Sequence, residues 1–384
     1  MLLITNGYIK PMAGPDLPNG AVLIGDDGKI KEVSPKIAAP AGCDVIDAQG
    51  RLVTPGCVEA HCHIGLDNEA VGWEGRDYNE IVDPITPQMR AIDSIYPQDE
   101  ALGNALQGGV TTACTGPGSA NVVGGTFAAI KLYGNRVDNM IVKNPIAMKC
   151  AFGENPKRCY GQGNKKAPMT RMGVASLLRE LLFKAKRYAE DKENGKNPGF
   201  DMKLEAMLPV IAGEIPLKCH AHRADDILTS IRIAKEFGVG LTLDHCTDGA
   251  CIADELAKEG FPAFVGPSLG NKSKVELNHK SFTTPAILHE AGVKVSIITD
   301  APVIPLQYLP MCAGMAATAG LDKEEAWRAI TINPAESTGI ADRVGSLEPG
   351  KDGDVVIWTA DPLTTVGAEA YITVVDGKVV YQQA

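Results

Sequence analysis

The sequence predicts a mixed α/β fold, a TIM-like (β/α)8 barrel joined to a small composite β-sandwich domain that both ends of the chain build. Three observations support this prediction. Both ends of the 384-residue chain carry short β-rich runs and tight turns, the middle alternates apolar strands with helical stretches, and the inner strands are eight in number. A chain of this length can bury enough surface to fold without disulfides.

The two ends of the chain resemble each other in their pattern. Residues 1–56 contain LLITNGYI, AVLIGDDGKIKEVS and GRLVTPG, in which Asn-Gly, Asp-Gly and Gly mark turns. The other end contains DVVIW at 354–358 and YITVVDGKVVY at 371–381, with Asp376-Gly377 as the expected hairpin turn. We therefore expect one β-sandwich domain made of residues 1–56 and 346–384.

Residues 57–345 are expected to form the barrel. Their apolar strand-like runs lie at 57–63, 110–116, 126–134, 146–153, 217–222, 241–246, 262–267 and 294–300. Helical stretches at 176–192, 227–237, 249–260 and 285–292 separate several of them. Continuous apolar runs are typical of parallel strands buried on both faces, so the sequence favours a parallel barrel.

Composition and charge exclude several classes of partner. Hydrophobic residues make up 45% of the chain, charged residues 22%, and the net charge is −10. The absence of a basic domain argues against nucleic acid and anionic membranes as partners. No run of 18 apolar residues is present, so no membrane span is expected. The ten cysteines show no C-x-x-C spacing, and without an export signal we expect reduced thiols and a cytoplasmic location.

Five of the seven histidines lie where predicted strands end. His61 and His63 share one face of their strand because alternate residues point the same way, and His220 and His222 repeat this pattern. His245 ends a further strand. Imidazoles that gather at the carboxyl end of a barrel are typical ligands of a divalent metal such as zinc.

Asp300 ends the last predicted strand and has two candidate roles. A carboxylate there can ligate a metal, and it can also take a proton from water and pass it to a leaving group. A bound metal would lower the pKa of its water to about 7. The structural alternative is a turn or cap residue before Pro302.

The chain resembles the amidohydrolase superfamily. The features are His-x-His soon after Thr-Pro-Gly, a lysine in the fourth strand, histidines in the fifth and sixth, an aspartate after the eighth, and the tail ITINPAESTGIADRVGSLEPGKDGDVVIW at 330–358. The resemblance covers nearly the whole chain and is strongest to imidazolonepropionase-like enzymes and metal-dependent dipeptidases. It implies a hydrolase of C–N bonds in amides, cyclic amides or amines that uses one or two divalent metals, often zinc.

The resemblance also implies a ligand set. His61 and His63 would hold the more buried metal with Asp300, and His220 and His245 would hold a second. In the two-metal relatives a carboxylated lysine bridges both ions, and Lys149 occupies that place. Two alternatives stay open: Glu154 is the bridging ligand, as a glutamate is in some members, or Lys149 is a buried charge paired elsewhere.

Substrate contacts are expected from basic residues. Deaminases of the superfamily carry a glutamate three residues after the histidine of the fifth strand, where this chain has Arg223. With Arg158 and Arg171 it suggests a small-molecule substrate that bears a carboxylate, because arginine binds carboxylates bidentately. An ion pair of Arg223 with Asp225 or Asp226 is the equal alternative.

The reaction that follows from these expectations is hydrolysis of an amide or cyclic amide by a metal-activated hydroxide. Asp300 would act as the proton shuttle and His222 would help to stabilise the oxyanion. A mononuclear, imidazolonepropionase-like hydrolase of cyclic amides is the closer alternative, and a catalytically silent barrel that serves as an assembly module is the other. The resemblance leaves a homo-oligomer open as well.

Overall fold

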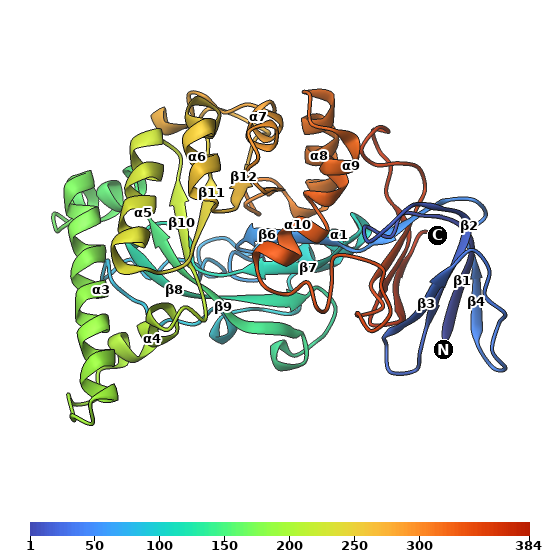
Figure 1. Ribbon diagram of the computed structural model, residues 1–384, viewed down its shortest axis with the longest axis horizontal. Helices are drawn as coiled ribbons and strands as arrows, with labels where there is room; N and C mark the ends of the chain where they lie inside the picture. Colours follow the sequence, from blue (N-terminus) through green and yellow to red (C-terminus); the bar gives the residue numbers. More distant parts are fainter.

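The computed structural model describes all 384 residues and places the eight predicted inner strands in one sheet. The strands are β6 (Cys57–Cys62), β7 (Val110–Thr115), β8 (Val123–Lys131), β9 (Ile141–Ala151), β10 (Leu217–Ala221), β11 (Leu241–His245), β12 (Ala263–Val265) and β13 (Val295–Ile297). They lie side by side in chain order, and the last strand contacts the first. The predicted TIM-like barrel is confirmed (Figure 1).

One strand of this barrel runs against the others. β8 is antiparallel to both β7 and β9, whereas the remaining neighbours are parallel. The expectation of an all-parallel barrel is therefore wrong for this strand. Residues 116–122 and 132–140, which connect β8 to its neighbours, carry no α-helix, and a parallel return needs a crossover of a dozen or more residues.

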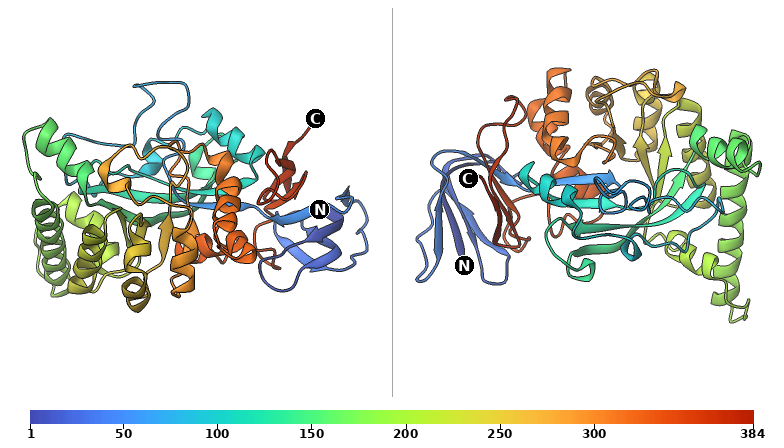
Figure 2. Two further views of the ribbon diagram at one scale, coloured as in Figure 1. Left: turned by 90° about the horizontal axis from the view of Figure 1, so that it is seen from above. Right: turned by 180° about the vertical axis from the view of Figure 1, so that it is seen from behind.

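Helices cover the outside of the barrel along β10 to β13, and α3 and α4 lie at the end farthest from the chain termini (Figures 1 and 2). The helices are α1 (Glu100–Gln107), α2 (Glu154–Pro156), α3 (Arg171–Glu193), α4 (Met202–Ile211), α5 (Ala224–Phe237), α6 (Ala253–Glu259), α7 (Thr284–Glu290), α8 (Leu309–Thr318), α9 (Lys323–Arg328) and α10 (Ile332–Ser337). All four predicted helical stretches are present. No helix combines the length and apolar character that a membrane crossing requires.

Strands from both termini share a second sheet, shown beside the barrel in Figure 2. It contains β1 (Leu2–Ile9), β2 (Leu17–Ile24), β3 (Ile30–Ser34), β4 (Asp44–Asp47), β5 (Leu52–Pro55), β14 (Val355–Trp358), β15 (Ala370–Val375) and β16 (Lys378–Gln382). Its order is β16-β15-β14-β5-β1-β2-β3, with β4 paired to β1. The composite origin is as expected, while the sandwich arrangement stays a prediction.

Of two dipeptides that the sequence marks as turns in this sheet, only one forms a turn. Asp376 and Gly377 have φ values of 48° and 74° and join β15 to β16, as predicted for a tight hairpin. Asn6-Gly7 forms no turn, because it lies inside β1 at an irregularity of the pairing with β2. Gly7 is needed there for packing, since a Cβ would lie 2.6 Å from Cγ2 of Val53.

A buried lysine connects the barrel to the terminal sheet. The Lys131 ammonium on β8 lies 2.6 Å from Asp354, 2.9 Å from Asp352 and 3.4 Å from Asp376. Its side chain is only 4% exposed. Lys131 is thus the cation that the barrel supplies to three carboxylates of the C-terminal segment, of which Asp352 also pairs with Lys29 and Arg343.

Replacing Lys131 with methionine should lower the free energy of unfolding by about 3–5 kcal/mol, because the buried carboxylate of Asp354 would lose its counter-charge. Denaturant unfolding measures this change. Lys258→Met is the matched control, since Lys258 pairs with Glu255 at an exposed site and should change stability by less than about 1 kcal/mol. Equal stabilities of the two variants would contradict the interpretation.

Candidate metal centre

The predicted histidines and Asp300 come together at the carboxyl ends of β6, β10, β11 and β13. Their side chains form two groups that share His245, one with His61 and Asp300 and one with His220 and His222. Within each group the potential ligand atoms lie within 4.8 Å of one another. All of these histidines are buried. The sequence pattern thus identifies side chains that meet in space.

Unusual backbone conformations direct two of these side chains. His245 has φ 76° and Asp300 has φ 53°, both in the left-handed region that residues other than glycine seldom adopt. Each such residue costs about 1–3 kcal/mol, and such strain is concentrated at functional sites. The turn at His245 also explains why both Asp244 and His245, which are neighbours in sequence, contact the same cluster.

The Nδ1 atoms of three imidazoles contact hydrogen-bond acceptors. The Nδ1 atoms of His63 and His245 donate to the carbonyls of Gly116 and Gly266 at 2.7 and 2.8 Å, and Nδ1 of His61 contacts the Asp244 carboxylate. A carbonyl can only accept, so these rings carry the proton on Nδ1 and a lone pair on Nε2. Nε2 of His63 lies 3.2 Å from Asp300.

These donors fit a divalent metal. Nε2 of His245 is buried and has no hydrogen-bond partner, which is costly for a polar atom inside a protein. A metal would satisfy such atoms, and imidazoles held through the other ring nitrogen are the usual arrangement of metal ligands. Neutral imidazole and carboxylate together suit zinc and several other divalent ions.

Burial sets the protonation of the cluster. It lowers the pKa of His61 to about 3 and that of His245 to about 4, so both rings are neutral at pH 7. Burial alone would raise the pKa of Asp300, but the neighbouring histidines hold it well below its usual range. The centre therefore presents neutral nitrogen donors beside an ionised carboxylate, as metal ligation requires.

Lys149 lies against this cluster from β9. Its side chain is fully buried, and Nζ lies 3.1 Å from Nε2 of His61. Lys149 forms no ion pair, since no carboxylate oxygen lies within 4.0 Å of its Nζ. Burial lowers its pKa to about 8. Glu154, the alternative bridging residue, contacts this region through its backbone N–H, which donates to the carboxylate of Glu276 at 3.1 Å. The bridging role of either residue stays a prediction.

Glu276 is a residue that the sequence reasoning missed. It lies in a 3-10 turn (Val275–Leu277) after β12, and its Oε1 is 3.8 Å from Nε2 of both His220 and His222. Burial raises its pKa, but the Lys274 ammonium at 2.8 Å outweighs this and keeps it below the usual range. Its position in the sequence could have suggested a role at the site, because loops that follow barrel strands lie on the active-site face.

The three predicted substrate-binding arginines have partners within the chain. Arg223 forms two hydrogen bonds with Asp225, both at 3.0 Å, which is the alternative that the sequence left open. Arg171 pairs with Asp226 at 2.9 Å. Arg158 donates to Asn155 at 3.4 Å, and the amide nitrogen of Asn155 lies 3.4 Å from Nε2 of His220. Only Arg158 is thus linked to the cluster, and a role in substrate binding stays a prediction for all three.

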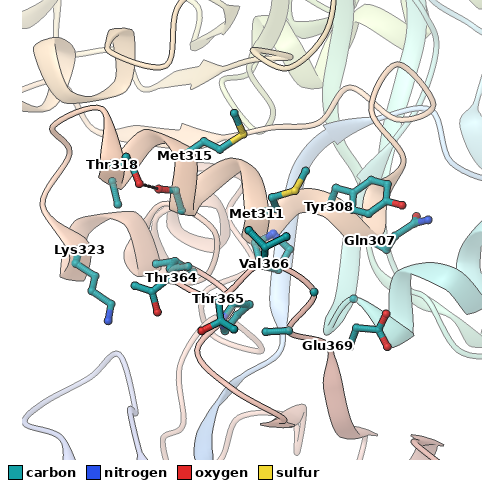
Figure 3. A pocket seen from close by; sticks show the side chains of 18 of the residues that line it. Gln307, Tyr308, Met311, Met315, Thr318, Lys323, Thr364, Thr365, Val366 and Glu369 are labelled. Carbon is teal, nitrogen blue, oxygen red and sulfur yellow. Dashed lines mark hydrogen bonds between the residues drawn. The ribbon is translucent and has the colours of Figure 1, made fainter.

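Two cavities lie away from the cluster itself. One, of about 870 Å³, lies between α1, α8 and the 362–369 loop, and Met311 and Val366 are among the residues that line it (Figure 3). The next, about 520 Å³, lies nearer to the cluster, since its walls include Ile64 and Ala301, the neighbours of His63 and Asp300. The larger cavity contains none of the predicted site residues.

Comparisons with known proteins agree with this geometry. The amidohydrolase family profile matches residues 52–380. The solved structure of an amidohydrolase from Thermotoga maritima MSB8 is 40% identical over the whole of both chains, with a TM-score of 0.96. An imidazolonepropionase from Rhizobium rhizogenes is 25% identical over 93% of this chain and 91% of its own length.

A longer relative is similar as well. Amidohydrolase tasK from Hapsidospora irregularis is 28% identical over 93% of this chain. The match spans only 39% of that relative's length.

Proposed function

The chain belongs to the amidohydrolase family, and from this premise we propose that it hydrolyses the C–N bond of a small amide or cyclic amide. It is a metal-dependent hydrolase of that family. The observation that supports the proposal best is the convergence of Nδ1-protonated histidines on Asp300, with a buried ring nitrogen of His245 left without a partner.

We assign the ligands as the resemblance implies. His61, His63 and Asp300 would hold one divalent ion, and His220 with His245 would hold a second. Lys149, carboxylated on Nζ, would bridge the two ions. We propose zinc as the metal, whose Lewis acidity would lower the pKa of bound water to about 7 and polarise the substrate carbonyl.

The remaining chemistry falls to the side chains. Asp300 would accept the proton of the attacking water at a carboxylate oxygen and deliver it to the leaving nitrogen. His222 would stabilise negative charge on the carbonyl oxygen, while its Nδ1 is held by the Thr247 hydroxyl at 2.8 Å.

A substrate screen tests the reaction class. Metal-loaded protein should release amines or ring-opened products from members of a panel of dipeptides, N-acyl amino acids and cyclic amides. Protein freed of metal by a chelator is the control and should be inactive until metal is restored. Hydrolysis that survives complete metal removal would contradict the proposal.

Glu276→Gln should weaken retention of the second metal by about 10–100-fold, as removal of an outer-shell carboxylate commonly does. The physical reason is its position 3.8 Å from both His220 and His222. Dialysis against a chelator followed by metal analysis measures the change. Glu255→Gln is the matched control, because Glu255 is exposed and pairs with Lys258 away from the histidines. The same loss of metal in both variants would contradict the assignment.

The mononuclear alternative rests on a specific observation. Imidazolonepropionases are among the relatives that match over nearly the whole chain. An enzyme of that type would hold one ion, leave Lys149 uncarboxylated and open a cyclic amide. Metal stoichiometry distinguishes the two possibilities.

We propose that residues 57–345 form the catalytic barrel and that residues 1–56 with 346–384 form the accompanying β-sandwich domain. We further propose a small-molecule substrate with a carboxylate, a cytoplasmic location and a homo-oligomeric state, with neither nucleic acid nor membrane as a partner.

A further inference from the structure

Two buried lysines and one buried aspartate lie beneath the histidine cluster. Lys149 on β9 and Lys218 on β10 are opposite each other in the strand register, and Asp244 follows on β11. Each of the three is at most 1% exposed. Because a buried charge needs a partner, the pairing among these groups determines which lysine is neutralised.

The contacts assign Asp244 to Lys218. The Lys218 ammonium lies 2.9 Å from Oδ2 of Asp244, an ion pair without hydrogen-bond geometry, and the ring centroids of Phe264 and Phe127 are 4.2 and 5.3 Å away. The Thr242 hydroxyl donates to the second oxygen of Asp244 at 2.8 Å. Lys149 forms no ion pair, since no carboxylate oxygen lies within 4.0 Å of its Nζ. Lys218 is therefore paired with a carboxylate and Lys149 is not.

Asp244 also holds His61. Oδ2 of Asp244 contacts Nδ1 of His61, so Nε2 of that ring faces Lys149 and Asp300. His63 and His245 are held by backbone carbonyls instead. Among these three rings, His61 alone depends on a charged side chain, and that side chain depends on Lys218.

We propose that Asp244 and Lys218 act as a positioning pair, which fixes the orientation and tautomer of His61 for metal binding and leaves Lys149 free for carboxylation. This inference rests on the proposed function, because His61 is a ligand only if the centre binds metal. Asp244 accepts the Nδ1 proton of His61, and Lys218 compensates the charge of Asp244. Both residues are buried, so we assign them a positioning role and no contact with substrate.

The test compares Asp244→Asn with the double variant Asp244→Asn/Lys218→Met, which removes both charges and so avoids a buried unpaired lysine. Titration of metal-free protein with Co²⁺ gives the affinity, and the visible spectrum of bound Co²⁺ reports ligand geometry. Both variants should bind one ion about 10–100-fold more weakly and show an altered spectrum. The double variant should recover thermal stability that the single variant loses.

A second measurement needs no metal. Nitrogen-15 NMR of histidine-labelled, metal-free protein should show His61 protonated on Nδ1 in the parent, and a mixture of tautomers in the double variant, since an asparagine amide offers either an acceptor or a donor. A fixed Nδ1 tautomer in both proteins would overturn the proposal, as would Co²⁺ affinity within twofold of the parent. A parent that holds this tautomer but binds no metal would contradict the proposed function and leave the pairing of Asp244 with His61 supported.

Discussion

Replacing Asp300 with asparagine should lower kcat by about 10²–10⁴-fold, the contribution that a positioned proton-transfer group commonly makes. An amide cannot take up the proton of the attacking water or deliver it to the leaving nitrogen. Asp300 lies 3.2 Å from His63 and 3.5 Å from His61, so it stands where a reacting group and the metal ligands would meet. Steady-state kinetics at saturating metal separates this loss from weaker metal binding.

The control for Asp300→Asn is Asp254→Asn, a change of the same chemistry at an exposed position in α6. That variant should keep parental turnover and stability. The thermal unfolding temperature of Asp300→Asn should show a folded protein. Near-normal turnover in a folded, metal-loaded Asp300→Asn variant would contradict the assigned role.

Replacing Lys149 with alanine should reduce bound metal from two ions per chain to at most one and lower turnover by orders of magnitude. The reason is that Nζ of Lys149 is buried 3.1 Å from Nε2 of His61. The other buried lysine beside the cluster, Lys218, is already paired with Asp244. Elemental analysis and kinetics on the same preparation, made with bicarbonate present, measure both effects.

Glu154→Gln decides between the two bridging candidates in the same experiment. If Lys149 bridges the ions, Glu154→Gln keeps parental metal content because its carboxylate makes no ion pair with the histidines. Loss of metal in Glu154→Gln, together with parental metal content in Lys149→Ala, would reverse the assignment.

The meeting of His61 and His220 could be predicted from sequence because both follow from strand periodicity and from the shared direction of the strand ends. Asp300 could be predicted only from its place just after the last strand, because its positive φ lies outside that periodicity. The contribution of Asp244 could not. Strict alternation sends Asp244 and His245 to opposite faces, and only the positive φ of His245 brings both to the cluster.

Other parts of the structure depend on tertiary contacts that a local pattern does not contain. Glu276 reaches the histidines because Lys274 and the backbone of Glu154 hold its loop in place. The reversed direction of β8 was in principle accessible, since its connections are too short for a helical crossover. An apolar run shows that a strand is buried, whereas the length of its connections decides its direction.

We propose that the cluster of His61, His63, His220, His245 and Asp300 holds the metal that the reaction needs. Elemental analysis of the parent protein, purified without added metal and with bicarbonate present, measures this binding. We expect two divalent ions per chain, and one ion that Lys149→Ala leaves unchanged would favour the mononuclear hydrolysis of a cyclic amide. Fully folded protein that retains no divalent ion, even after incubation with zinc, manganese or cobalt, would contradict the proposed metal site.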